Sequence, residues 1–229
     1  MMGARQGHND PLLAGFFSVS EAARLLGVKQ VHIRGWINGY ANSSAGPVIK
    51  RDFEDQRTVS FLDLMELRFI AFFRAQGVSM PTIRRAAERA RKEWRVQHPL
   101  ALSSAKYVTD RKKVFATAAE ETDDPVAWDM ASGQHEMWGT IEQTIEKGVL
   151  FDPKNYLAKT WRPLPAQFPN VVIDPRIAFG RPVVAGTQVP TSVLFRQWKA
   201  EGHTDRVAKW FEVSPEVVAT AVEYELVAA

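Results

Sequence analysis

The pattern of apolar and polar positions predicts two short helices near the N-terminus. Apolar residues recur at helical spacing over residues 19–26, and a second helix is expected over about residues 29–38. Ser18 and Glu21 have the spacing of a capping box, which begins the first helix. Gly27 ends that helix, so the two helices are joined by a turn of very few residues.

The second of these helices is expected to have an inner apolar side and an outer polar side. Val31 and Ile33 are predicted to pack inward. The remaining faces then carry residues that are largely polar: Lys29, Gln30, His32, Arg34 and Trp36. Two short helices joined by a glycine turn are typical of the helix-turn-helix, whose second helix enters the major groove of DNA.

The following residues predict a hairpin and two more helices. Residues 47–51 and 57–60 can form the strands of a wing, with a turn between them. Ser60 and Asp63 form a second capping-box pattern, which opens a very apolar helix over residues 61–73. A further amphipathic helix is expected over residues 79–94.

Residues 18–94 resemble the DNA-binding domain of MerR-type regulators. The resemblance is carried by Gly27–Val28, Arg34, Trp36, Pro47, Arg57 and Gly77–Val78–Ser79, together with the capping residues of the first helix. It implies that the second helix and the wing both contact DNA. Neither a long coiled coil nor a cysteine-bearing effector segment follows, so the resemblance does not extend to metal or drug sensing.

The candidate DNA-binding residues lie on the two helices and on the wing. Arg34, Trp36 and Arg57 are the positions that the MerR resemblance implies. Residues near the start of a recognition helix usually meet base edges, and wing cations hold phosphates. Trp36 has a second interpretation, as a core residue, because large aromatic side chains are more often buried. The complete set is Ser20, Lys29, Gln30, His32, Arg34, Trp36, Lys50, Arg51 and Arg57.

Beyond residue 98 the pattern predicts a small β-rich middle region. Residues 106–109 and 113–117 flank a polar turn, and residues 126–130 and 134–138 flank Ser132–Gly133. These segments are interpreted as hairpins. One or two helical turns are expected over residues 140–147, followed by a proline-rich connector that extends to about residue 170.

The C-terminal residues predict a turn-rich segment and then three helices. A short apolar strand over residues 171–173 is followed by closely spaced glycine and proline residues. Helices are expected over residues 191–201 and 204–211, and Ser214–Pro215 begins a third. The last helix is expected to expose three acidic residues and no basic ones: Glu216, Glu223 and Glu225.

This C-terminal block resembles a small trihelical family of unknown function that accompanies PIN-like ribonuclease toxins in bacteria. The motifs that carry the resemblance are Ile173–Asp174–Pro175, Gly180–Arg181–Pro182, Gly186–Thr187 with Pro190, and Ser214–Pro215–Glu216. Joined to a MerR-like head, it resembles the longer VapB-type antitoxins. The resemblance implies a PIN-like ribonuclease as partner, with Arg181, Thr187, Glu216 and Glu223 as candidate toxin-binding residues.

Charge is distributed unevenly along the chain. Residues 1–98 contain 15 Lys and Arg against 9 Asp and Glu, whereas the remainder contains 14 against 17. The basic excess therefore coincides with the predicted DNA-binding part, as phosphate neutralisation requires. The acidic surface of the last helix argues against a second DNA-binding site there and suits a basic protein partner.

The sequence does not contain a recognisable catalytic or metal-binding pattern. The five histidines are scattered, cysteine is absent and there is no phosphate-binding glycine loop. The acidic run at residues 120–124 does not bracket a metal pair, so a nuclease is not favoured. We therefore expect neither enzymatic activity nor a cofactor. No apolar run reaches membrane-spanning length and the N-terminal residues lack the basic-then-apolar pattern of a signal peptide, so we expect a cytoplasmic protein.

The sequence thus predicts an α+β protein with four parts: a flexible lead-in (1–15), a MerR-like winged helix-turn-helix (16–98), a β-rich middle region with connector (99–170) and a trihelical, helix-turn-helix-like domain (171–229). The expected function is that of a type II antitoxin that represses its own operon and binds its toxin. A homodimer or a higher toxin–antitoxin assembly is expected, because one head contacts one half-site. The alternative is a stand-alone MerR-like regulator whose C-terminal part dimerises or senses an effector.

Overall fold

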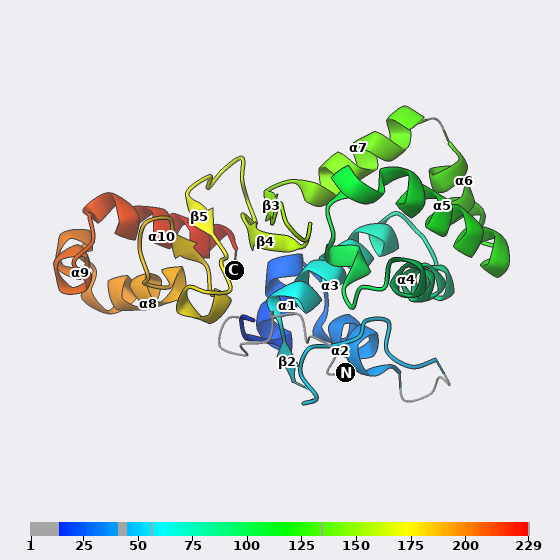
Figure 1. The fold of residues 1–229 in the computed structure, drawn as a ribbon. Coiled ribbons are helices and arrows are strands. Elements are labelled where there is room, and N and C mark those ends of the chain that lie inside the picture. Colours follow the sequence, from blue (N-terminus) through cyan, green and yellow to red (C-terminus); the bar gives the residue numbers. More distant parts are fainter. Residues whose placement is uncertain (1–13, 41–44, 56, 134, 229) are drawn as a thin grey trace, which may run out of the picture. The chain divides into compact units, whose positions relative to one another are not determined.

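The computed structural model describes residues 14–40, 45–55, 57–133 and 135–228 (Figure 1). Most of the expected lead-in, residues 1–15, lies outside these ranges. The chain divides into two compact units. The head unit comprises residues 18–161, and the tail unit comprises residues 162–229 together with the N-terminal residues up to 17. The helical middle of the chain therefore belongs to the same unit as the N-terminal helices.

The first two helices form as their sequence pattern predicts. After the short strand β1 (Phe17–Ser18), α1 (Val19–Leu26) begins with a complete capping box. The Ser18 hydroxyl accepts from the backbone N–H of Glu21, and the Glu21 carboxylate accepts from the N–H of Ser18. Gly27 ends α1 in the left-handed region, with φ of 64°, and α2 (Gln30–Asn38) follows.

The predicted wing hairpin is wrong in its first strand. Strand β2 (Thr58–Val59) is present, but residues 47–51 do not form a strand. Val48 and Ile49 are buried instead, and the N–H of Val48 donates to the carbonyl of Trp36 at 2.9 Å. Adjacent residues of a strand point to opposite faces, so a wing strand with one solvated face would expose Val48 or Ile49; this segment instead bends and packs against the end of α2 with both side chains buried.

Helix α3 (Phe61–Ala75) is the centre of the head unit. It begins with the second predicted capping box, Ser60 with Asp63. Helix α4 (Met80–Trp94) follows with Ser79 as its N-cap, and the short 3₁₀ helix η2 (Pro99–Ala101) packs near α3. These helices confirm the predicted ones over residues 61–73 and 79–94.

The middle region is helical, which corrects the predicted hairpins. It contains α5 (Ser104–Thr122), α6 (Pro125–Ser132) and α7 (His135–Glu146). On α5 the buried residues Val114, Phe115, Ala118 and Ala119 recur at helical spacing, so the segment has one apolar helical face. The predicted helix over residues 140–147 is confirmed as the end of α7. Strands β3 (Val149–Phe151) and β4 (Ala158–Trp161) pair in antiparallel fashion, with Val149 opposite Trp161.

A cluster of aromatic rings joins the middle helices to α3. Phe73 stacks on Phe115 with ring centroids 4.6 Å apart and lies 6.2 Å from Trp138 on α7. Phe69 also contacts Phe73 at 4.6 Å. These rings are almost completely buried, and each aromatic pair adds about 0.5–1.5 kcal/mol beyond its buried area. They fix α5 and α7 against the apolar face of α3.

Asp124 accepts hydrogen bonds at the start of two different helices. It is the N-cap of α6, where its carboxylate accepts from the N–H of Ala127 at 3.1 Å. The same carboxylate accepts from the N–H of Ser79 at 2.8 Å and from the Thr82 hydroxyl at 2.6 Å, at the start of α4. One side chain therefore satisfies donors from the N-termini of α4 and α6.

The tail unit consists of a small sheet and three helices. Strand β5 (Val171–Val172) pairs with β6 (Val183–Val184) in antiparallel fashion, and the 3₁₀ helix η3 (Ala178–Gly180) lies between them in the chain. Helices α8 (Thr191–Glu201), α9 (Thr204–Phe211) and α10 (Pro215–Val227) confirm the three predicted helices. Their core includes Leu194, Val207, Val218 and Tyr224.

The structure as a whole is a mixed helical fold with small antiparallel sheets, consistent with the α+β class. Among the described residues, no helix is both long and apolar enough to cross a membrane.

Candidate nucleic-acid interface

The outer face of α2 carries a row of polar side chains. Gln30, Arg34 and Asn38 are four residues apart, so they lie on one side of the helix, and all three are exposed. The Arg34 guanidinium donates to the Gln30 side-chain oxygen at 3.4 Å, and the Gln30 amide donates to the Ser20 hydroxyl at 3.3 Å. Ser20, on α1, thus lies beside the start of α2, and the predicted residues of both helices share one surface.

The remaining predicted residues near the start of α2 are also exposed. Lys29 is the N-cap of the helix, and its side chain makes no capping hydrogen bond. His32 is exposed one turn before Trp36. Val31 was expected to pack inward, but 57% of it is exposed, whereas Ile33 is fully buried as predicted. The inner face of α2 is formed by Ile33, Trp36 and Ile37 at helical spacing, which leaves Val31 outside.

Trp36 belongs to the core. Only 3% of it is exposed, and its ring stacks on His32 with centroids 6.0 Å apart. This position agrees with the second interpretation of this residue from sequence. The buried Trp36 ring packs against the exposed His32 ring. Trp36 itself could contact DNA only if its side chain left the core.

The loop between α2 and β2 contributes further basic side chains. Lys50 and Arg57 are exposed. Arg51 is half-buried and donates to the side-chain oxygen of Asn38 at 3.3 Å and to the carbonyl of Thr58. It therefore links the end of α2 to β2, and its guanidinium has internal acceptors that a phosphate would have to replace.

The loop between α2 and β2 also takes part in a charge cluster that the sequence pattern does not reveal, and all members of this cluster except Asp52 are buried. The His98 ring donates from Nε2 to Asp52 Oδ1 at 2.9 Å and from Nδ1 to Glu66 Oε2 at 3.3 Å. Asp63 Oδ1 lies 3.8 Å from His98 Nδ1. His98 is 4% exposed, and Asp63 and Glu66 are fully buried. We call Asp52, Asp63, Glu66 and His98 the charge cluster; it joins the loop, α3 and η2.

Electrostatics favour the imidazolium form of His98 in this cluster. Burial lowers the pKa of His98, but the hydrogen bonds and charges of Asp52 and Glu66 outweigh it and raise the pKa to about 10. Burial raises the pKa of Asp63 to about 6, against the opposing charge of His98. The cluster is thus a set of ion pairs around one buried cation.

Asp52, Asp63 and His98 also offer potential ligand atoms within 4.8 Å of one another. A metal ion would need an imidazole nitrogen with a free lone pair. Both nitrogens of His98 donate to carboxylates, and the raised pKa keeps both protons in place at neutral pH. Ion pairing therefore explains this arrangement better than metal ligation.

The candidate toxin-binding residues lie in the tail unit. Arg181 is exposed after η3, and the Thr187 hydroxyl donates to the carbonyl of Val184 at 2.8 Å. Glu216 and Glu223 are exposed on α10. Glu225 was also expected at the surface, but it is 7% exposed and accepts from the Thr191 hydroxyl at 2.5 Å. Its position toward α8 follows from the helical phase of α10, where Ala221, Val222 and Tyr224 are also buried.

Comparison with known proteins adds three findings. Residues 171–224 match a family described as "Protein of unknown function (DUF433)". The chain is 25% identical over 227 residues to a protein of Mycobacterium tuberculosis named "Putative antitoxin VapB45", covering 90% of this chain and 92% of that protein. Its fold is similar to the crystal structure of Rv2018 from M. tuberculosis, with a TM-score of 0.64 and 23% identity over 90% of this chain and 96% of that chain. The chain therefore has distant homology to a VapB-type antitoxin along most of its length.

Proposed function

We propose that this protein is the antitoxin of a type II toxin–antitoxin pair that binds operator DNA and neutralises a PIN-like ribonuclease. The observation that carries this proposal is the likeness to the protein named as an antitoxin, which extends over 90% of the chain and so includes both units. The match of residues 171–224 to a separate family supports a distinct role for the tail unit.

In this proposal the exposed face of α2 reads DNA. Gln30 and Arg34 provide amide and guanidinium groups that can form paired hydrogen bonds with base edges, and the exposed methyl groups of Val31 suit contact with a thymine methyl. Lys29, Lys50 and Arg57 would neutralise phosphates on either side. Because Gln30 already bonds Ser20 and Arg34, these side chains are partly ordered before DNA arrives.

The proposal assigns toxin binding to the tail unit. Helix α10 has exposed Glu216 and Glu223 but no Lys or Arg anywhere along it. A ribonuclease that binds RNA needs a basic groove, and an acidic helix is electrostatically complementary to such a groove. Occupation of the groove by α10 would exclude RNA.

Quantitative DNA binding tests the role of α2. Titration of DNA fragments from the promoter of the protein's own operon should identify an operator. Arg34→Ala should lower its affinity by about 1–3 kcal/mol and relax the preference at one base pair, and Arg57→Ala should reduce the salt slope by about one. Arg196→Ala, at an exposed arginine on α8, is the matched control. Equal effects of Arg34→Ala and Arg196→Ala would exclude α2 as the reading helix.

Affinity purification of the tagged chain from its host tests toxin binding. A stoichiometric partner that stays bound at high salt, and that degrades RNA only after separation from this chain, would support the antitoxin function. Glu216→Lys with Glu223→Lys should release that partner. Recovery of the chain alone, still bound to a specific operator, would contradict toxin binding and favour a stand-alone regulator.

A further inference from the structure

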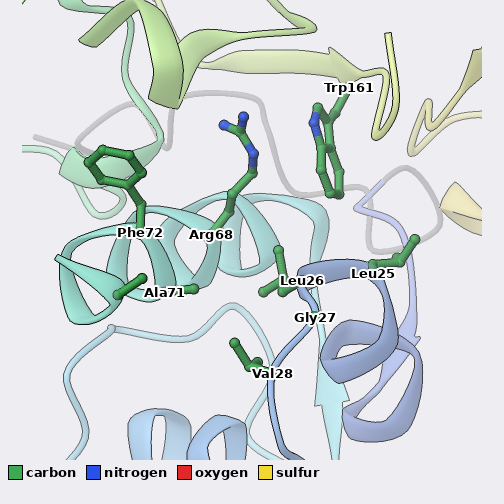
Figure 2. A pocket seen from close by; sticks show the side chains of 9 residues that line it. Leu25, Leu26, Gly27, Val28, Arg68, Ala71, Phe72 and Trp161 are labelled. Carbon is green, nitrogen blue, oxygen red and sulfur yellow. The ribbon is translucent and has the colours of Figure 1, made fainter. Parts of the chain in front are cut away.

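The head unit contains a cavity of about 320 Å³ beside the turn that joins α1 to α2 (Figure 2). Its walls come from the end of α1, the turn itself, one face of α3, and Trp161 on β4. Most of the lining is apolar, and Leu25, Leu26, Val28, Ala71 and Phe72 remain half-exposed there. A volume near 300 Å³ with apolar walls is within the range of small-molecule sites.

Two polar groups face one another at the edge of this cavity. Figure 2 shows the Arg68 guanidinium and the Trp161 indole on either side of the opening above Leu26. The guanidinium carbon lies 5.3 Å from the centroid of the indole ring, a cation–π distance. Trp161 is only 4% exposed, yet its Nε1–H has no hydrogen-bond acceptor among the described residues. A buried N–H without an acceptor is costly, so an acceptor that reached it would be stabilised. Neighbouring atoms shield Nε1 from solvent, so a ligand acceptor has to displace the side chains that cover it.

Arg68 gives the site a positive charge. Its guanidinium donates to the carbonyls of Thr144, Ile145 and Lys147 at the end of α7, which leaves further N–H groups of the five in a guanidinium. The carbonyls at the end of α7 and the charge of Glu146 balance the guanidinium in part. Burial lowers the pKa of Arg68 to about 10, and the charge of Glu146 only partly opposes this. An anionic group beside Arg68 and Trp161 would therefore be stabilised.

We propose that this cavity binds a small apolar carboxylate. Its hydrocarbon part would lie between α1 and α3, and its carboxylate would accept from the Trp161 Nε1–H and from Arg68. The apolar walls alone would admit any hydrophobic molecule of this size. The positive charge of Arg68 and the N–H of Trp161 at one end select an acid.

The location of the cavity gives the ligand a route to α2. Gly27 and Val28 line the cavity and also form the whole link between α1 and the N-cap of α2. Gly27 has φ of 64°, and the N–H of Val28 donates to the carbonyl of Ala23 at 3.0 Å. A ligand that presses on this turn changes the angle at which α2 leaves it. Any consequence for DNA binding rests on the proposed function, whereas ligand binding does not.

Calorimetric titration of the full chain with 1-naphthylacetate tests the proposal, with the neutral 1-naphthylacetamide as the matched probe. We expect the acid to bind at least about tenfold more tightly than the amide, because a charged acceptor strengthens its hydrogen bonds. Trp161→Phe keeps the ring and removes the donor, and it should weaken the acid by about tenfold while leaving the amide less affected. Ala71→Leu and Ala75→Leu fill the cavity and should abolish binding of both probes.

NMR locates the probe and its effect on the turn. The indole N–H resonance of Trp161, assigned from its absence in Trp161→Phe, should shift on titration, and backbone amides over residues 27–34 should shift with it. Equal affinity for acid and amide would overturn the proposed selectivity. Binding that persists in correctly folded Ala71→Leu and Ala75→Leu would place the ligand elsewhere. A Trp161 resonance that responds to protein concentration but to neither probe would show a second copy of the chain in the cavity instead.

Discussion

Replacing His98 by glutamine should strongly destabilise the head unit at neutral pH. The substitution keeps a polar side chain of similar size but removes the cation that lies within 4 Å of Asp52, Asp63 and Glu66. Breaking a buried ion pair by removing one partner costs about 3–5 kcal/mol. The pKa of His98, raised from 6.5 to about 10, leads to a similar figure of about 4 kcal/mol at pH 7, because about three of the pKa units, at 1.36 kcal/mol each, still count at that pH.

Urea unfolding followed by circular dichroism at pH 7 measures this loss. In a thermal scan the melting temperature should fall on the order of 10 °C, since each kcal/mol shifts a domain of this size by about 2–4 °C. His203→Gln is the control, because His203 is exposed and makes no capping bond with its side chain. It should change the free energy of unfolding by less than about 0.5 kcal/mol.

A combined variant separates charge from packing. Adding Asp52→Asn and Glu66→Gln to His98→Gln removes two of the carboxylates that the lost cation had balanced. This triple variant should recover at least half of the lost stability, because only Asp63 of the cluster then remains as a carboxylate without its cation. A His98→Gln loss below about 1 kcal/mol, or a triple variant no more stable than the single one, would refute the ionic explanation.

Three further predictions concern pH and hydrogen bonding. The wild-type free energy of unfolding should fall as pH rises from about 6.5 to about 10. The raised pKa of His98 gives stability that is complete below the pKa of the unfolded state and is lost as pH rises through the pKa of the folded state. Urea midpoints at pH 7 and 9.5 measure this fall, and a His98→Gln variant with the same pH dependence would contradict it. Thr191→Val removes the hydroxyl that donates to buried Glu225 and should lower the free energy of unfolding by about 1.5–3 kcal/mol, measured by thermal unfolding. A change near zero would show that this hydrogen bond contributes little to stability. Ser18→Ala breaks the capping box with Glu21 and should lower the free energy of unfolding by about 1 kcal/mol, again measured by thermal unfolding. Ser18→Asp should be nearly neutral, because aspartate also accepts at an N-cap. Equal losses of stability in the two variants would exclude capping as the cause.

Helix boundaries were predictable where short-range side-chain chemistry sets them. The boxes at Ser18 and Ser60 and the Ser79 cap bond their own helix within three residues, so the sequence contains the whole interaction. In the tail unit, Gly202 ends α8 in the left-handed region and Pro215 starts α10, again by local geometry. These elements needed no knowledge of the tertiary fold.

The middle of the chain could not be predicted from local pattern alone. Residues 113–117 contain β-branched and aromatic side chains that favour a strand, but Phe115 stacks on Phe73, and this distant contact fixes the segment as a helix. The charge cluster was equally hidden, since His98 and Asp52 are 46 residues apart and neither belongs to a recognisable motif. For the candidate site, the exposed polar row of α2 agreed with the sequence pattern, whereas the burial of Trp36 depends on packing.

The sharing of Asp124 between α4 and α6 has a consequence for the order of folding. Its bonds to Ser79 and Thr82 close a loop of more than 40 residues, so the entropy of the whole helical hairpin α4–α5 is lost before they form. We therefore expect these two bonds to form late in folding, after α4 and α5 have packed together. Loss of the Asp124 carboxylate would leave donors unpaired at the starts of α4 and α6 together, so one substitution at this position would weaken two helices that are far apart in the sequence.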